Sequence, residues 1–336
     1  MKGIDLMKEE DIRPDSLMRE NAKLRAEDIR KILKRKDEFV EISCPACESS
    51  SYRLVFQKDG FTFVCCKQCE TVFVNPRPTY EMLTEFYTTS KSIRHWNDRI
   101  FPASEDSRRS QIFAPRAQSI IELCRKYNAA TRVLLDVGAG FGTFCEEIEK
   151  LAVFDEVIAV EPSRALADTC HHKGLDVIEK PIEEVELNQV DVITNFELIE
   201  HLFWPKGFLS ACVKALRRGG LLIVTTPNIK GFDLLVLGKL SDNIGGPNHL
   251  NYFHPASLSR LLNDCGFEVL ETSTPGRLDA ELVRKKALRG EFDLSTHPFL
   301  KQVLIDEWER VGVCFQKFLA DNGFSSNMWF AACKCG

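Results

Sequence analysis

Two stretches of this sequence carry side chains of the types and spacing that chemistry needs. The first reads Asn-Phe-Glu-Leu-Ile-Glu-His at residues 195–201. If this run is helical, Glu197, Glu200 and His201 share one face of a turn, because residues three and four apart are neighbours there. His249 can supply a fourth ligand, and two glutamates with two histidines can hold a divalent cation, Mg²⁺ or Mn²⁺. The alternative needs no metal, and His201 then acts as a general base or only positions its neighbours.

The second stretch contains two C-x-x-C pairs, Cys44-Pro-Ala-Cys47 and Cys66-Lys-Gln-Cys69, with residues 48–65 between them. Four thiolates at this spacing are typical of a zinc ribbon. Four protein ligands leave Zn²⁺ no open position, so we expect a structural ion that stabilises a module with a small core. A redox pair is the alternative, although a single C-x-x-C would suffice for it.

A glycine-rich loop, Leu-Leu-Asp-Val-Gly-Ala-Gly-Phe-Gly-Thr at residues 134–143, follows an apolar strand and precedes a helical pattern. Its glycines, Gly138, Gly140 and Gly142, let a ligand approach the backbone closely. The spacing G-x-G-x-G differs from the dinucleotide pattern G-x-G-x-x-G. Asp136 would repel a pyrophosphate but suits a cationic ligand, so a nicotinamide-dependent oxidoreductase is disfavoured.

Glu161 ends the next strand-like run, about 20 residues beyond the glycine loop. A carboxylate at this place in an α/β fold binds both hydroxyls of a ribose. The loop and Glu161 together predict a ligand that has a ribose and a positive charge.

The elements that must position these residues form an α/β fold. From residue 132 onward, strand-like apolar runs alternate with helical patterns, which predicts a parallel sheet with helices on both faces. The predicted strands are 133–137, 156–161, 176–178, 190–195, 221–226, 267–272 and 327–333.

We divide the chain where its sequence pattern changes. The predicted parts are a charged helical lead-in at 1–43, the ribbon at 44–78, a helical lid at 79–130, the ligand-binding catalytic domain at 131–275 and a helical cap with the last strand at 276–336.

Composition narrows the function classes. The chain has 336 residues, 13 cysteines and a formal net charge of −5. An acidic balance without a long basic stripe argues against nucleic acid as a partner. No run approaches the roughly 20 apolar residues of a membrane span, and we expect a cytoplasmic protein with free or metal-bound thiols.

Residues 131–227 resemble the class I S-adenosylmethionine-dependent methyltransferases. The resemblance rests on LLDVGAGFGTF, AVEPS, VDVITNFELIEHL and LRRGGLLIVTTPN, which occur in the family's order. It implies a Rossmann-like seven-stranded methyltransferase sheet and S-adenosylmethionine as cofactor. The cofactor-binding residues that it implies are Asp136, Gly138, Gly140, Gly142 and Glu161, with Pro181 and Ile182 at the adenine and Asn195 beside the loop.

Two further resemblances bear on the acceptor. The Glu-x-x-Glu-His run is similar to that of some small-molecule O-methyltransferases and of the small-RNA 2′-O-methyltransferases, which hold a divalent metal. The ribbon and the following Asn-Pro-Arg-Pro, residues 75–78, resemble a bacterial lineage associated with sugar and polysaccharide modification.

We therefore expect O-methylation of a small-molecule, glycan or nucleotide-sugar hydroxyl. The alternatives are an RNA or protein methyltransferase whose ribbon binds the substrate, and a protein that binds S-adenosylmethionine without catalysis.

Overall fold

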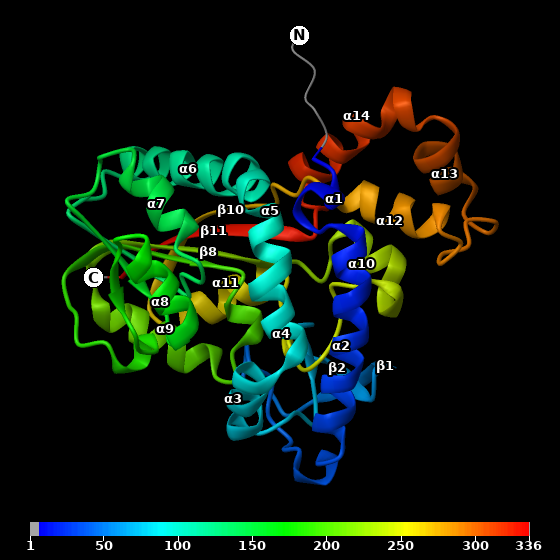
Figure 1. Cartoon of the computed structure of the whole chain (residues 1–336), viewed down its shortest axis with the longest axis horizontal. Coiled ribbons are helices and arrows are strands. Elements are labelled where there is room, and N and C mark those ends of the chain that lie inside the picture. Colours follow the sequence, from blue (N-terminus) through cyan, green and yellow to red (C-terminus); the bar gives the residue numbers. More distant parts are fainter. Residues whose placement is uncertain (1–6, 336) are drawn as a thin grey trace.

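A seven-stranded sheet forms the centre of the computed structural model, which describes residues 7–335. Its order is β10-β11-β8-β7-β4-β5-β6 (Figure 1). The bounds are β4 Val133–Val137, β5 Glu156–Val160, β6 Asp176–Ile178, β7 Val190–Phe196, β8 Leu216–Pro227, β10 Phe267–Ser273 and β11 Asn327–Lys334.

The strand directions define a Rossmann-like α/β fold. Strands β4, β5, β6, β7 and β8 pair in parallel, and β11 is antiparallel to both β8 and β10. The chain reverses its strand order between β4 and β7, so the loops after these strands open into a crevice where such folds bind ligands. This is the predicted fold class, and each predicted strand is present.

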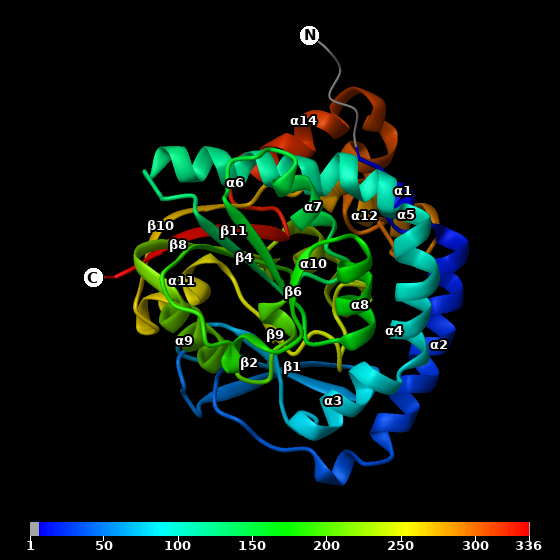
Figure 2. The same cartoon turned by 60° about the vertical axis from the view of Figure 1, so that its left-hand side comes forward.

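Helices cover both faces of the sheet (Figure 2). On one face, α6 Ala114–Lys126, α7 Thr143–Glu149 and α8 Arg164–His172 pack around buried side chains such as Ile120 and Phe144. On the other face lie α9 Pro205–Ala215 and α11 Pro255–Asp264, whose Phe208 and Leu261 join a second core. The alternation of strand side chains between two cores explains why these strands are apolar throughout.

The cysteine-bearing segment shares a sheet with the rest of the chain. Strands β1 Tyr52–Lys58, β2 Phe61–Cys66 and β3 Val72–Val74 continue antiparallel into β9 Asn251–Tyr252. Tyr252 is buried in the same apolar cluster as Phe63 and Val74. The segment that we predicted as a small separate module is therefore packed against the α/β domain.

Further helices lie outside these two layers. They are α1 Glu9–Ile12, α2 Asp15–Leu33, α3 Tyr80–Thr89, α4 Lys91–His95, α5 Phe101–Arg108, α10 Phe232–Leu237, α12 Asp279–Leu288, α13 Pro298–Lys301 and α14 Trp308–Asp321. Short 3₁₀ segments lie at Lys36–Glu38, Ile182–Glu184, Ile199–His201 and Gly238–Leu240, and π-helical segments at Trp96–Ile100, Arg109–Phe113 and Gln302–Asp306.

The charged lead-in is more than a solvated helix. Ile29 and Ile32 of α2 join the core of the ribbon sheet, and Asp28 accepts hydrogen bonds from the backbone of Lys91 and Ser92 at the start of α4. Residues 1–6 of the predicted lead-in lie outside the described residues. Within residues 7–335, none of the helices combines the length and apolar character that crossing a membrane would need.

The last part of the chain contains the predicted helical cap between β10 and β11. Lys285 of α12 pairs with Glu9 and Asp15, at 2.8 and 2.7 Å. The N-terminal helices and the cap thus contact each other beside the crevice (Figure 1).

Candidate active site

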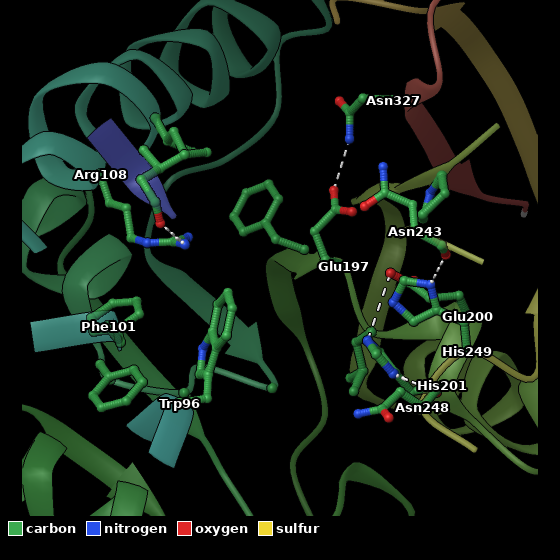
Figure 3. Close-up of a pocket in the computed structure, with 18 of the residues that line it drawn as sticks. Trp96, Phe101, Arg108, Glu197, Glu200, His201, Asn243, Asn248, His249 and Asn327 are labelled. Carbon is green, nitrogen blue, oxygen red and sulfur yellow. Dashed lines mark hydrogen bonds and ion pairs between the residues drawn. The ribbon is translucent and has the colours of Figure 1, made fainter. Parts of the chain in front are cut away.

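A cavity of about 2380 Å³ runs from the glycine loop to the N-terminal helices. The loop after β4, the end of β5 and the loop after β7 line one side, and α1, α2 and the helices before α6 line the other. Figure 3 shows Trp96, Phe101 and Arg108 across the pocket from Glu197, Glu200, His201 and His249.

The glycine loop and Glu161 are joined in the way that ribose binding requires. The Glu161 carboxylate accepts hydrogen bonds from the Gly140 amide at 2.8 Å and the Ser163 amide at 2.9 Å. Gly138 and Gly140 have φ values of +77° and +56° and line the cavity. A Cβ on Gly138 would lie 2.8 Å from Leu198, whereas one on Gly140 would meet only open space.

Two predicted cofactor residues do not line the cavity. Gly142, at φ +69°, faces the protein interior, where a Cβ would lie 2.4 Å from Leu175 and 2.9 Å from Cys170. Asn195 is fully buried and donates to the Val137 carbonyl at 3.1 Å. The assignment of both residues to the cofactor stays a prediction; in the structure Gly142 permits close packing, and Asn195 joins β7 to β4 beneath the loop.

Asp136 lies at the cavity wall and is almost completely buried. It accepts a hydrogen bond from Thr194 at 2.7 Å, and burial raises its pKa to about 7. Pro181 and Ile182 also line the cavity, beyond the end of β6. Asp136, Pro181 and Ile182 therefore lie at the wall of one cavity.

The predicted helical turn after β7 is absent. Glu197 has φ +51°, and a 3₁₀ turn follows at Ile199–His201. The carboxylate of Glu197 turns away from Glu200 and accepts hydrogen bonds from Thr225 at 2.7 Å and Asn327 at 2.9 Å. Arg116 lies 3.5 Å away. Glu197 is therefore not brought together with the other predicted metal ligands.

Glu200, His201 and His249 do converge. One potential ligand atom from each lies within 4.8 Å of the others, and Nε2 of His201 is 3.8 Å from Oε1 of Glu200. Both imidazoles are oriented by backbone carbonyls: Nδ1 of His201 donates to Asn248 at 2.7 Å, and Nδ1 of His249 to Asn243 at 2.9 Å. Because these Nδ1 atoms carry the proton, both Nε2 lone pairs are free to bind a ligand.

Burial governs the charge of this cluster. It raises the pKa of Glu200 well above its ordinary value, and it lowers the pKa of His201 and of His249. Oε1 of Glu200 is buried and has no hydrogen-bond partner among residues 7–335, although Oε2 accepts from Thr226 at 2.8 Å. A buried carboxylate oxygen without a partner is costly, and a bound cation would satisfy it.

The four predicted ribbon cysteines form a second cluster. Their sulfur atoms lie within 4.8 Å of one another, with Cys44–Cys69 and Cys47–Cys66 each at 3.5 Å. Tetrahedral Zn–S bonds of about 2.3 Å place sulfurs roughly 3.8 Å apart, so the cluster is compatible with zinc. Cys65 lies outside it.

Sequence reasoning missed two sets of cavity residues. Asn327, at the start of β11, has no motif that marks it. Phe101 and Arg108 are distant from the glycine loop in the chain, and only the fold brings them to the cavity. Tyr87 of α3 is a further cavity residue, and its hydroxyl lies 3.2 Å from Nδ1 of His201.

Known proteins that resemble this chain are methyltransferases. Residues 108–272 match the model of a methyltransferase domain. A probable S-adenosylmethionine-dependent methyltransferase of Mycolicibacterium smegmatis is 31% identical over 150 residues, 44% of this chain and 56% of the relative. A ubiquinone biosynthesis O-methyltransferase of Bradyrhizobium sp. (strain ORS 278) is 31% identical over 132 residues, 34% of this chain and 51% of the relative.

The chain thus spans about half the length of these curated relatives. A solved S-adenosylmethionine-dependent methyltransferase from Archaeoglobus fulgidus aligns with a TM-score of 0.48 at 19% identity, covering 70% of this chain and 100% of that one.

Proposed function

We propose that this protein is an S-adenosylmethionine-dependent O-methyltransferase acting on a small-molecule hydroxyl. The observation that carries the proposal is one continuous cavity that joins the glycine loop and Glu161 to the Glu200, His201 and His249 cluster. The match of residues 108–272 to a methyltransferase domain supports it.

The cofactor lies along the glycine loop in this account. Glu161 binds the ribose hydroxyls, and its hydrogen bonds to the Gly140 and Ser163 amides hold the carboxylate in place before binding. Asp136 is close to the amino end through the loop, and Pro181 and Ile182 border the adenine. The methyl group then faces the crevice after β7, where an acceptor can enter.

Methyl transfer needs a hydroxyl held in line with the sulfonium. The acceptor oxygen forms a bond to the methyl carbon while the sulfur–carbon bond breaks, and S-adenosylhomocysteine is released. Holding the two reactants in one cavity supplies most of the advantage, because positioning replaces a collision. Without a bound metal, Nε2 of His201 can accept the hydroxyl proton, since its Nδ1 donates to the Asn248 carbonyl.

We further propose that Glu200, His201 and His249 bind a divalent metal. The free Nε2 atoms and the unpartnered Oε1 of Glu200 fit such an ion. A metal bound there would lower the pKa of a coordinated hydroxyl. Two imidazoles and one carboxylate suit Mn²⁺ better than Mg²⁺, which prefers oxygen ligands.

The ribbon cysteines are proposed to bind structural zinc. Four thiolates close the coordination shell, so this ion takes no part in catalysis. The glycan or nucleotide-sugar acceptor suggested by the ribbon remains a prediction, as does a cytoplasmic location.

Calorimetric titration with S-adenosylhomocysteine tests the cofactor assignment. We expect one molecule to bind per chain and Gly140→Val to abolish binding, because the added side chain would occupy the open space above the loop. A folded wild-type protein that does not bind S-adenosylhomocysteine would overturn the proposed function.

Electron paramagnetic resonance of added Mn²⁺ tests the metal site separately. We expect wild-type protein to bind one Mn²⁺ and both Glu200→Gln and His249→Ala to lose it. His171→Ala, at an exposed histidine on α8, is the control. Equal Mn²⁺ binding by all four proteins would exclude this site.

A further inference from the structure

One wall of the cavity is built from aromatic rings and a cation, and the proposed reaction does not yet use it. Trp96, Phe101 and Arg108 lie there, opposite the cluster of Glu200, His201 and His249 (Figure 3). The ring of Phe101 stacks on Phe141 of the glycine loop, with centroids 3.7 Å apart and planes at 8°. The wall is therefore in direct contact with the loop that we assign to the cofactor.

Ionic contacts also hold helix α5, which carries Phe101 and Arg108, against the α/β domain. Glu105 of α5 accepts hydrogen bonds from Lys173 at 2.8 Å and from Thr143 at 3.1 Å. Arg109, which follows α5, pairs with Glu146 at 2.8 Å. Because these partners belong to α7 and the end of α8, the wall keeps its position relative to the glycine loop.

The guanidinium of Arg108 is oriented from several sides. Its Cζ lies 5.2 Å from the ring centroid of Trp96 and 5.5 Å from that of Phe101. Nε donates to Ser104 at 2.9 Å, and Nη2 donates to the Ile12 carbonyl at 2.6 Å. Nη1 has no protein partner among residues 7–335. An arginine held in this way loses little entropy when it binds a further group.

The two arginines near Arg108 are paired with carboxylates, whereas Arg108, among the residues described, is not. Arg13 lies 3.6 Å from Glu9, and Arg116 lies 3.5 Å from Glu197. Arg108 has no carboxylate within ion-pair distance in the described part of the chain. Burial and the two neighbouring arginines lower its pKa to about 10, which leaves it cationic at neutral pH. The local field at Arg108 therefore attracts an anion.

A short path of contacts links this arginine to the proposed reaction centre. Ile12, which accepts from Arg108, is followed by Arg13, whose Nη1 donates to Oδ1 of Asn243 at 3.3 Å. The carbonyl of the same Asn243 accepts from His249 at 2.9 Å. One molecule that reaches from the cluster to Arg108 would thus stay within a single cavity.

We propose that Arg108 binds an anionic group of the methyl acceptor, a carboxylate or a phosphate, while the acceptor hydroxyl lies at Glu200, His201 and His249. The inference rests on the proposed function and makes it specific for acidic acceptors. S-adenosylmethionine also has a carboxylate, but we expect its methionine end at Asp136 and Gly138. The arginine nearest to that end is Arg116, because Asp136 is among the charges close to Arg116.

Titration calorimetry with two probes tests the assignment. Protein saturated with S-adenosylhomocysteine is titrated with inorganic phosphate and, separately, with benzoate, so that the two anion chemistries are distinguished. The variants are Arg108→Gln and Arg108→Lys, and Arg99→Gln is the control because Arg99 is an exposed arginine of the same segment.

We expect at least one probe to bind wild-type protein and Arg99→Gln with equal Kd. Arg108→Gln should weaken that binding at least about tenfold, because a charge-assisted hydrogen bond is lost, and Arg108→Lys should retain part of it. Equal affinity in Arg108→Gln, or no binding of either probe to wild-type protein, would overturn the proposal.

The cofactor titration of Arg108→Gln separates the two anion sources. We expect its affinity for S-adenosylhomocysteine to equal that of wild-type protein. A large loss would place Arg108 at the cofactor carboxylate and contradict the acceptor assignment. If wild-type protein binds no S-adenosylhomocysteine, the proposed function fails, and the same phosphate and benzoate titrations without cofactor still decide whether Arg108 binds anions.

Discussion

Replacing Glu161 should weaken cofactor binding strongly while leaving the fold intact. The Glu161 carboxylate is buried at the cavity wall, and the amides of Gly140 and Ser163 hold both of its oxygens. Each hydrogen bond from a ribose hydroxyl to a charged carboxylate contributes about 1.5–3 kcal/mol. The loss of two such bonds in Glu161→Ala corresponds to about 3 kcal/mol or more, which is at least about 100-fold in Kd.

Calorimetry with S-adenosylhomocysteine measures this change. Glu161→Gln should bind with intermediate affinity, because the amide keeps one acceptor oxygen. Glu179→Ala, at an exposed glutamate after β6, should bind as wild-type protein does. Circular dichroism checks that each variant is folded. A Kd for Glu161→Ala within threefold of the wild-type value would refute the assignment of Glu161 to the ribose.

Three other changes test glycine packing, zinc binding and the pH dependence of stability. Gly142→Ala should lower Tm, since φ is +69° and a Cβ would lie 2.4 Å from Leu175; an unchanged Tm in differential scanning calorimetry would contradict this packing role. Cys66→Ser should reduce bound zinc, measured by elemental analysis, from one ion per chain to a small fraction, and Tm should fall with it; Cys314→Ser, at an exposed cysteine, should change neither. Burial raises the pKa of Asp233 to about 7, so the stability that its protonated form contributes is lost as pH rises from about 4 through 7. Asp233→Asn should therefore reduce the fall in Tm between pH 5 and pH 8, and an unaltered fall would count against this carboxyl group as its source.

Local sequence patterns predicted the sheet well. A short apolar run directly before a glycine loop, such as Val133–Val137, is typical of a buried strand. The observed bounds of β4 are the predicted ones. The strand β9, Asn251–Tyr252, has only two residues and was missed, because such a short pairing depends on the neighbouring β3 and not on its own sequence.

The candidate site was predictable only where the chain is regular. The glycine loop and Glu161 belong to one β-α-β unit, so the sequence alone predicted that they lie close together. The arrangement of Glu197, Glu200 and His201 could not, because the left-handed backbone at Glu197 replaces the expected helical turn. Arg108 reaches the cavity through tertiary packing, for which no local pattern exists.

A crystal structure with S-adenosylhomocysteine and Mn²⁺ would test the central claim most directly. We predict that the ribose hydroxyls contact Glu161, that the sulfur faces the crevice after β7, and that anomalous density for Mn²⁺ lies among Glu200, His201 and His249. A cofactor bound away from Glu161, or with its sulfur directed away from this cluster, would contradict the proposed methyl transfer.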